Sequence, residues 1–142
     1  MELVQCIYCS ASTEENLSDQ ALEDILEQSR RNNARADITG ILLFDSGAFF
    51  QVLEGDSSAI DALYLKIKKD TRHDKVTRLI FEPIDERAFG EWSMGYPKIT
   101  KEDLKEIPGM NDFFAHGNSF MELEAGRAKT MLSAFKKGNW RV

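Results

Sequence analysis

Two polar side chains lie at positions that strand alternation assigns to a buried face. Residues 49–54 read as a strand, in which Gln51 shares a face with Phe49 and Leu53. In the strand near the N-terminus, Tyr8 shares a face with Cys6. If helices cover this face, a carboxamide and a phenol point into the core. The periodicity leaves a second reading open, in which the two side chains merely satisfy each other or face solvent.

Further polar groups lie at the end of the first predicted helix. Its apolar stripe, Leu22, Ile25 and Leu26, continues into Ser29, Asn32 and Asn33. Buried polar groups need partners, because each one left unpaired costs about 1–3 kcal/mol. Amides supply both donors and acceptors, so they match a flat ligand whose polar edge alternates carbonyl and N–H. We therefore expect a ligand pocket between two helices, with Ile25 and Ile67 against the faces of the ring.

Cys6 and Cys9 have the C-x-x-C spacing of a redox dithiol or of half a zinc site. In a strand, however, positions three apart point to opposite faces, so the two sulfurs could not meet. The chain contains no second C-x-x-C and only two histidines. The strand interpretation is favoured, and no metal site is expected.

The order of predicted elements is strand, helix, strand, strand, helix, strand, followed by a further short strand. The predicted strands are 2–10, 38–44, 49–54, 76–82 and 92–95. The first helix is N-capped by Ser18, and the second begins at residue 57. This order predicts an α+β fold, a ferredoxin-like βαββαββ sheet with two helices on one face. After about residue 100 the pattern becomes helical, with a short helix at Thr100 and a longer one over 119–137 that begins at a Ser119–Glu122 capping box and ends at Gly138. We expect these C-terminal helices to pack on the other face of the sheet; the apolar stripe of 119–137 could alternatively pack on a neighbouring subunit.

Composition excludes several classes of protein. The 142-residue chain carries a net charge of −6, which argues against a general nucleic-acid surface and against attraction to an anionic membrane. No segment approaches the roughly 18 apolar residues of a membrane span. The N-terminus lacks the pattern of a signal peptide. We expect a single cytoplasmic domain.

Several linked motifs resemble the BLUF family of FAD-binding blue-light sensors, in its short single-domain form. They are Ile7-Tyr8-Cys9-Ser10, the stretch 29–40, Phe49-Phe50-Gln51-Val52-Leu53-Glu54-Gly55, Asp70-Thr71-Arg72-His73, Arg87-Ala88-Phe89 and Trp92-Ser93-Met94. The resemblance implies a sensor domain over residues 1–98, with 99–142 as a helical extension. The departures, at Cys9, at Ala36 and in a loop after Ser10 that is one residue longer than in some relatives, touch no photochemical position.

The resemblance also implies the roles of the residues. FAD would bind between the two helices, with Tyr8 as electron and proton donor, and Gln51 would bridge Tyr8 and the flavin edge. Light would leave Gln51 rearranged or tautomerised and the absorption shifted to the red, with Trp92 and Met94 as the switch positions beside Gln51. The cofactor-binding residues would be Ile25, Ser29, Asn32, Asn33, Phe49, Gln51, Ile67, Asp70, Arg72 and His73. Which of Trp92 and Met94 faces inward stays open.

These implications define a photoreceptor that is not an enzyme. It would signal to an unidentified downstream protein or within a homodimer or larger homo-oligomer. Two alternative functions are less favoured. A flavin-binding redox protein would need a substrate cavity and an electron-donor site that the sequence does not indicate. A ligand-free interaction module or small hydrolase would leave Tyr8 and Gln51 unexplained on a buried face.

Overall fold

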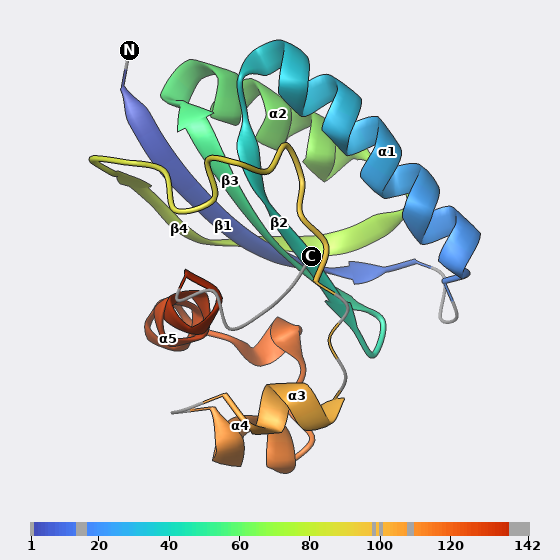
Figure 1. Cartoon of the computed structure of the whole chain (residues 1–142). Coiled ribbons are helices and arrows are strands. Elements are labelled where there is room, and N and C mark those ends of the chain that lie inside the picture. The colour runs from blue at the N-terminus through green and yellow to red at the C-terminus, as the bar shows by residue number, and fades with distance from the viewer. Residues whose placement is uncertain (1, 14–16, 98, 100, 108–109, 137–142) are drawn as a thin grey trace.

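A four-stranded antiparallel sheet forms the centre of the fold, with strand order β2-β3-β1-β4 (Figure 1). The strands are β1 (Leu3–Ser12), β2 (Thr39–Asp45), β3 (Ala48–Asp56) and β4 (His73–Pro83). The computed structural model describes residues 2–13, 17–97, 99, 101–107 and 110–136. β2 and β3 form a hairpin whose turn residues, Ser46 and Gly47, both have positive φ, as a tight hairpin turn requires.

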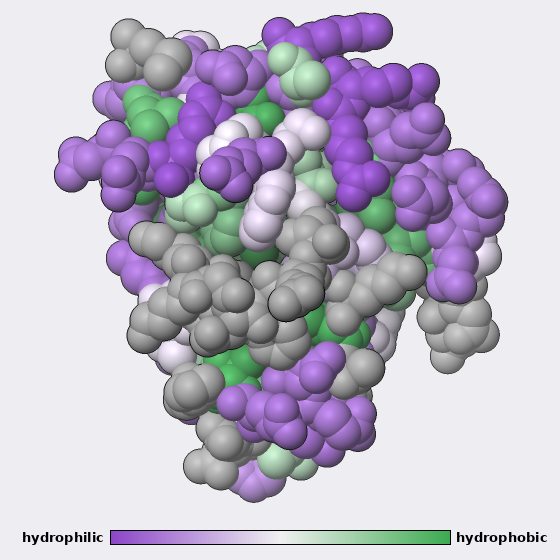
Figure 2. All heavy atoms as spheres, in the orientation of Figure 1, coloured by the Kyte–Doolittle hydropathy of each residue, from purple (hydrophilic) through white to green (hydrophobic). Residues whose placement is uncertain are grey.

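Two helices cover one face of the sheet, α1 (Asp19–Ala36) and α2 (Ser57–Lys69) (Figure 1). The predicted N-cap is confirmed, because Ser18 Oγ accepts a hydrogen bond from the Ala21 N–H at 3.0 Å. Asp37, in the left-handed region, ends α1. The outward side of α1 is hydrophilic in the space-filling view (Figure 2), as expected of a helix that buries only one stripe.

The C-terminal segments cover the opposite face, which confirms the predicted placement (Figure 1). They are α3 (Lys101–Lys105), α4 (Asn111–Ala115), the 3₁₀ helix η1 (Phe120–Glu122) and α5 (Ala125–Lys136). Their buried side chains form one apolar cluster with alternate residues of β1, β2 and β3. The sheet therefore separates two cores, and the predicted α+β architecture is confirmed.

The further strand predicted at 92–95 is reduced to a single bridge. Gly95 pairs with Ile41 of β2 in parallel orientation, and Trp92 N–H bonds back to Phe89 O at 3.1 Å. The chain turns at that point, so an extended strand cannot form.

The helix predicted over 119–137 is divided. The Ser119–Glu122 capping box is present, but it opens only the single turn of η1, which ends at the extended and buried Leu123 before α5 starts. Burial of Leu123 in the core accompanies this break. The predicted end at Gly138 lies outside the described residues, as does the predicted helix start at Thr100.

Candidate functional site

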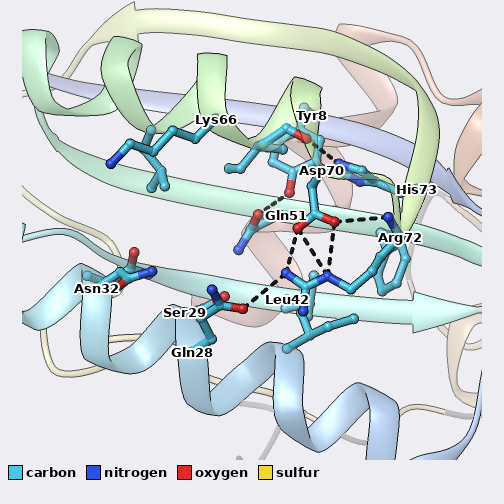
Figure 3. Close-up of a pocket in the computed structure, with 15 residues that line it drawn as sticks. Tyr8, Gln28, Ser29, Asn32, Leu42, Gln51, Lys66, Asp70, Arg72 and His73 are labelled. Atoms are coloured by element: carbon cyan, nitrogen blue, oxygen red, sulfur yellow. Dashed lines mark hydrogen bonds and ion pairs between the residues drawn. The ribbon is translucent and has the colours of Figure 1, made fainter.

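A cavity of about 260 Å³ lies between α1, α2 and the sheet (Figure 3). All ten residues predicted to contact a cofactor line it, together with Tyr8. They are Ile25, Ser29, Asn32, Asn33, Phe49, Gln51, Ile67, Asp70, Arg72 and His73. The two predicted switch positions, Trp92 and Met94, are not among the lining residues.

Tyr8 and Gln51 are brought together by strand pairing. They are directly opposite each other in the β1–β3 ladder, and both side chains are buried. The Tyr8 hydroxyl donates a hydrogen bond to Gln51 Oε1 (Figure 3). Burial raises the pKa of the Tyr8 phenol well above its usual value, so the hydroxyl keeps its proton at neutral pH. The prediction that a phenol and an amide share a buried face is confirmed.

The strand that pairs with the other edge of β1 is irregular beside Tyr8. The β1–β4 register shifts between Ile7 and Tyr8 and again between Cys9 and Ala11. Such bulges bend a strand locally and re-aim side chains, and they are common next to functional sites. Here they flank the phenol on both sides.

The second hydrogen bond of Gln51 shows which of the two predicted switch residues faces the amide in this structure. Gln51 Nε2 donates to Met94 Sδ at 3.3 Å, and Met94 is 2% exposed. Trp92 packs instead against the core on the opposite face of the sheet, where its ring stacks on Phe89 with centroids 5.8 Å apart. In this structure Met94 is inward, an alternative that the sequence left open.

Two side chains of α1 hold the backbone that carries Met94. Asn33 Nδ2 donates to Ser93 O at 2.8 Å, and Arg30 Nε donates to Met94 O at 2.9 Å. Asn33 is buried while Asn32 and Ser29, on the same helix, are less enclosed at the cavity wall. Asn33 thus contacts both the cavity and the segment beside it.

The mouth of the cavity is charged. Asp70 accepts hydrogen bonds from the Arg72 guanidinium, whose other contact is Gln28 Oε1 of α1 at 3.2 Å (Figure 3). The hydrogen bond from the Arg72 side chain lowers the pKa of Asp70 below its usual value. Lys66 lines the cavity as well. The Asp70–Arg72 pair therefore links the end of α2 to α1.

His73 has a defined tautomer. Its Nε2 lies 2.5 Å from the carbonyl oxygen of Ile67, which can only accept, so Nε2 carries the proton. Its Nδ1, 2.8 Å from Ser10 Oγ, then accepts from the serine hydroxyl in the neutral ring. His73 packs edge-on to Tyr8 and so helps to enclose the phenol.

Four lining residues were missed by the sequence interpretation: Gln28, Leu42, Leu63 and Lys66. Leu42 is the β2 partner of Gln51 in the ladder, and Leu63 lies one helical turn before Ile67. Strand alternation and helical spacing could have found both. Gln28 and Lys66 carry no signal that separates them from an ordinary solvated face.

The described residues fit a flavin. Amide groups of Asn32, Asn33 and Gln51 line the cavity and offer the donors and acceptors that the polar edge of the ring needs. Apolar side chains of Ile25 and Ile67 supply the walls for its flat faces. The volume lies near the lower end of ligand pockets, roughly 300 Å³, which suits the ring system of the cofactor rather than the whole of FAD.

The chain matches a family described as "Sensors of blue-light using FAD" (BLUF) over residues 3–95. The matched range covers the sheet, α1, α2 and the segment through Gly95.

Curated relatives align over the same region. Photoactivated adenylate cyclase subunit beta of Euglena longa is 36% identical over 139 residues, covering 96% of this chain and 16% of that protein. Photoactivated adenylate cyclase subunit alpha of Euglena gracilis is 38% identical over 108 residues, covering 75% of this chain and 10% of that protein. The chain spans only a small fraction of the length of these relatives, and cyclase activity is theirs.

Solved structures match the whole fold. The ground state of BlsA superimposes with a TM-score of 0.83 at 30% identity, covering 99% of this chain and 91% of that one. Its photo-activated state gives 0.81 at 32% identity, covering 99% of both chains. The dark state of BlrB, a BLUF protein, gives 0.69 at 32% identity, covering 94% of this chain and 97% of that one. The aligned region of this chain therefore corresponds to a sensor domain and not to a catalytic domain, and no enzymatic activity is assigned to it.

Proposed function

The chain belongs to the BLUF family of blue-light sensors, whose domains bind flavin, and on this premise we propose that it is a photoreceptor that uses FAD. Light would change the hydrogen bonding of Gln51, and that change would be passed to the segment that carries Met94. The observation that supports this most directly is the buried chain of hydrogen bonds from Tyr8 through Gln51 to Met94, whose first two members line the cavity.

Tyr8 is suited to give up an electron and a proton together. A bound flavin absorbs blue light and in its excited state is a strong oxidant. Among the lining residues Tyr8 is the only phenol, and its proton is already shared with Gln51 Oε1. A phenol that loses an electron becomes strongly acidic, so a hydrogen-bond acceptor must be in place to receive its proton. Gln51 is that acceptor.

Gln51 is suited to act as the switch because its orientation is set by one weak contact. The Tyr8 hydroxyl can donate or accept, so it fits either orientation of the amide. The Met94 thioether can only accept, so it selects the orientation with Nε2 toward sulfur. Sulfur is a weak acceptor, which leaves a second arrangement of the amide close in energy. A rotated or tautomerised Gln51 would release Met94.

A flavin that carries phosphate, as FAD does, is supported by the cationic groups that line the cavity. Lys66 and Arg72 both line the cavity and are exposed, so each could meet the part of a cofactor that extends beyond the ring. Their charges would attract phosphate groups. Chromatography of the cofactor released by heat would identify it, and a preparation that retained only FMN or only riboflavin would contradict this part of the proposal.

We further propose that the signal leaves by changed contacts with a partner protein or with another copy of the chain. Large exposed hydrophobic side chains available for such contacts are Leu65, 58% exposed, and Phe81, 36% exposed. Within the described residues, no helix is long and apolar enough to cross a membrane. Light-scattering mass measured in the dark and under blue light tests the oligomer, and a single-chain mass in both would rule out self-association as the route.

An absorption spectrum taken before, during and after blue light tests the light switch. The purified yellow protein should show a small red shift that reverses in the dark, and Tyr8→Phe should abolish it. Tyr64→Phe is the matched control, because Tyr64 is also buried and packs edge-on to Tyr8 at 6.0 Å but does not line the cavity. That variant should keep the shift. An unchanged wild-type spectrum, or a normal shift in Tyr8→Phe, would refute the proposal.

A further inference from the structure

The buried carboxylate of Glu54 has no part in the light switch described above. Glu54 lies on β3, three residues beyond Gln51, and its side chain is 0% exposed. Strand alternation points it to the face opposite Gln51. A buried carboxylate is costly unless it is well paired, so its partners indicate what it does.

Glu54 is surrounded by donors. Its Oε2 accepts from the Ala88 N–H at 2.8 Å and from Gln5 Nε2 at 3.1 Å, and its Oε1 accepts from the Phe89 N–H at 2.8 Å. An ionised carboxylate only accepts, so three donors suit it fully. Hydrogen bonds to a charged acceptor are about twice as strong as neutral ones. Two of the three donors are backbone groups of one short segment, which is therefore fixed in place.

The clamped segment crosses the β2 edge of the sheet. Phe89 is buried in the core under the C-terminal helices, and Trp92 packs against that same core. Gly40 N–H bonds to Trp92 O at 3.0 Å, and Gly95 N–H bonds to Gly40 O at 2.9 Å, so the segment then runs beside β2 (gold in Figure 1). Met94 ends up in the other core, on the cavity face. Residues 88–95 thus connect the two faces.

One strand holds both ends of this segment. Gln51 binds Met94 on the cavity face, and Glu54 binds Ala88 and Phe89 on the other face. Phe89 in turn stacks on Trp92. With Phe89 fixed, the Trp92 ring has its packing partner in the core beneath the C-terminal helices. Met94 is then the residue that contacts Gln51.

We propose that Glu54 is a positioning residue that clamps the backbone at Ala88 and Phe89 and thereby sets Met94, rather than Trp92, against Gln51. Its relevance to signalling rests on the proposed function. The clamp itself is tested in the dark, so its failure and a failure of the light response are distinguished.

Glu54→Gln tests the clamp with little change in shape. The substitution replaces one acceptor oxygen by an NH2 group, which donates and therefore cannot accept from the N–H group it faces. Hydrogen exchange of the Ala88 and Phe89 amides, followed by NMR in the full chain kept dark, should be about tenfold faster or more, as expected for loss of a charge-assisted hydrogen bond. Glu82→Gln is the control for charge, since Glu82 is a partly exposed β4 carboxylate that pairs with Lys129; it should leave both amides unchanged.

The consequence for Met94 has its own measurement. The chain has two tryptophans, so in a Trp140→Phe background fluorescence reports Trp92 alone. Adding Glu54→Gln should lower the Trp92 emission, because a ring that leaves Phe89 for Gln51 comes close to the bound flavin and is quenched. If amide exchange is unchanged in folded Glu54→Gln, the clamp is refuted. If exchange rises but Trp92 emission stays the same, the positioning role is refuted.

A second variant covers the case in which Glu54→Gln does not fold. Gln5→Leu removes one side-chain donor and keeps both backbone donors. It should speed exchange of the Ala88 amide, which shares Oε2 with Gln5, more than that of the Phe89 amide. Equal and unaltered exchange at both amides would overturn the proposal.

Discussion

The two faces of the sheet are built from the same strands and differ in almost every physical property. On β3, Phe49 and Gln51 face the cavity while Phe50 and Val52 face the C-terminal helices. The cavity face keeps open space and buried polar groups joined by hydrogen bonds. The opposite face is a closed core, apolar apart from the hydrogen-bonded Glu54 and Gln5, and it contains several aromatic contacts, among them Phe50 with Phe120.

This difference separates stability from function within one sheet. A closely packed core without voids contributes more to stability than a core that contains a cavity, and the space between α1 and α2 is such a cavity. The face covered by the C-terminal helices must therefore supply stability that the cavity face cannot. Substitutions on the two faces are expected to affect different measurements.

The largest effect is expected from Phe120→Ala, in the core beneath the C-terminal helices. Phe120 is almost wholly buried against Phe50 and Phe114, so its truncation leaves a cavity and should lower the free energy of unfolding by about 3–5 kcal/mol. Denaturant unfolding measures it. Phe81→Ala, at a side chain 36% exposed, is the control and should cost clearly less. The absorption spectrum and light response of folded Phe120→Ala should stay normal. Loss of the response without loss of stability would show that the faces are not separable in this way.

The sequence predicted the contrast between the faces better than it predicted the details of the cavity. Period-2 alternation assigned Tyr8 and Gln51 to one face and Phe50 to the other, and both assignments are confirmed. Alternation alone could not show that β3 lies next to β1, which is what places Tyr8 opposite Gln51. The two cysteines also fall in separate cores, Cys6 on the cavity face and Cys9 on the other, so the C-x-x-C spacing forms no disulfide.

The arrangement around Met94 could not be predicted, because it depends on contacts between distant segments. At the turn formed by Phe89 and Trp92, the Phe89 N–H donates to the Glu54 carboxylate, which lies far earlier in the chain. Gly95 also matters, since a Cβ there would lie 3.0 Å from the Trp92 ring and 3.2 Å from Ile41. No periodicity carries such information. The break of the last helix at Leu123 is likewise set by the core that buries it.

A second effect, about 1.4 kcal/mol, is expected on the cavity face at alkaline pH. Burial raises the pKa of the Tyr8 phenol above its unfolded value of 10.0, so its contribution to stability is complete below pH 10 and falls as pH rises further. Between pH 9 and pH 11 the wild type should lose about 1.4 kcal/mol more unfolding free energy than Tyr8→Phe. Burial also raises the pKa of the Cys6 thiol to about 12, but that loss occurs in both proteins and cancels. Equal alkaline losses in the two proteins would show that the phenol ionises freely.

A smaller stability effect with a clear spectroscopic result is expected from Met94→Leu. The exchange nearly conserves volume and should cost less than about 1.5 kcal/mol. It removes the acceptor that selects one orientation of the Gln51 amide, so the dark absorption band should move or broaden. Trp92→Phe, on the opposite face, is the control and should leave the dark band unchanged. If Met94→Leu has the wild-type dark band, sulfur does not determine the amide orientation.

The smallest effect is expected from the two surface ion pairs, one associated with each face. Arg72→Gln at the cavity mouth and Lys129→Gln on α5 each remove a partly exposed pair, and each should change unfolding free energy by about 1 kcal/mol or less near neutral pH. The two variants differ in how their unfolding free energy changes in acid. The pKa of Asp70 is lowered by its hydrogen bond from Arg72, so the stability this contact provides is present above the unfolded pKa of 3.8 and is lost as pH falls through the folded value.

The wild type and Lys129→Gln should therefore lose more unfolding free energy between pH 6 and pH 3 than Arg72→Gln does. Arg72→Gln should also release its flavin faster than Lys129→Gln, because Arg72 lines the cavity mouth and Lys129 does not. Stopped-flow dilution followed by flavin fluorescence measures that rate. Equal release from both variants would mean that the charge at the mouth has no part in holding the cofactor, and the contrast between the faces would then reside wholly in the buried chain of Tyr8, Gln51 and Met94.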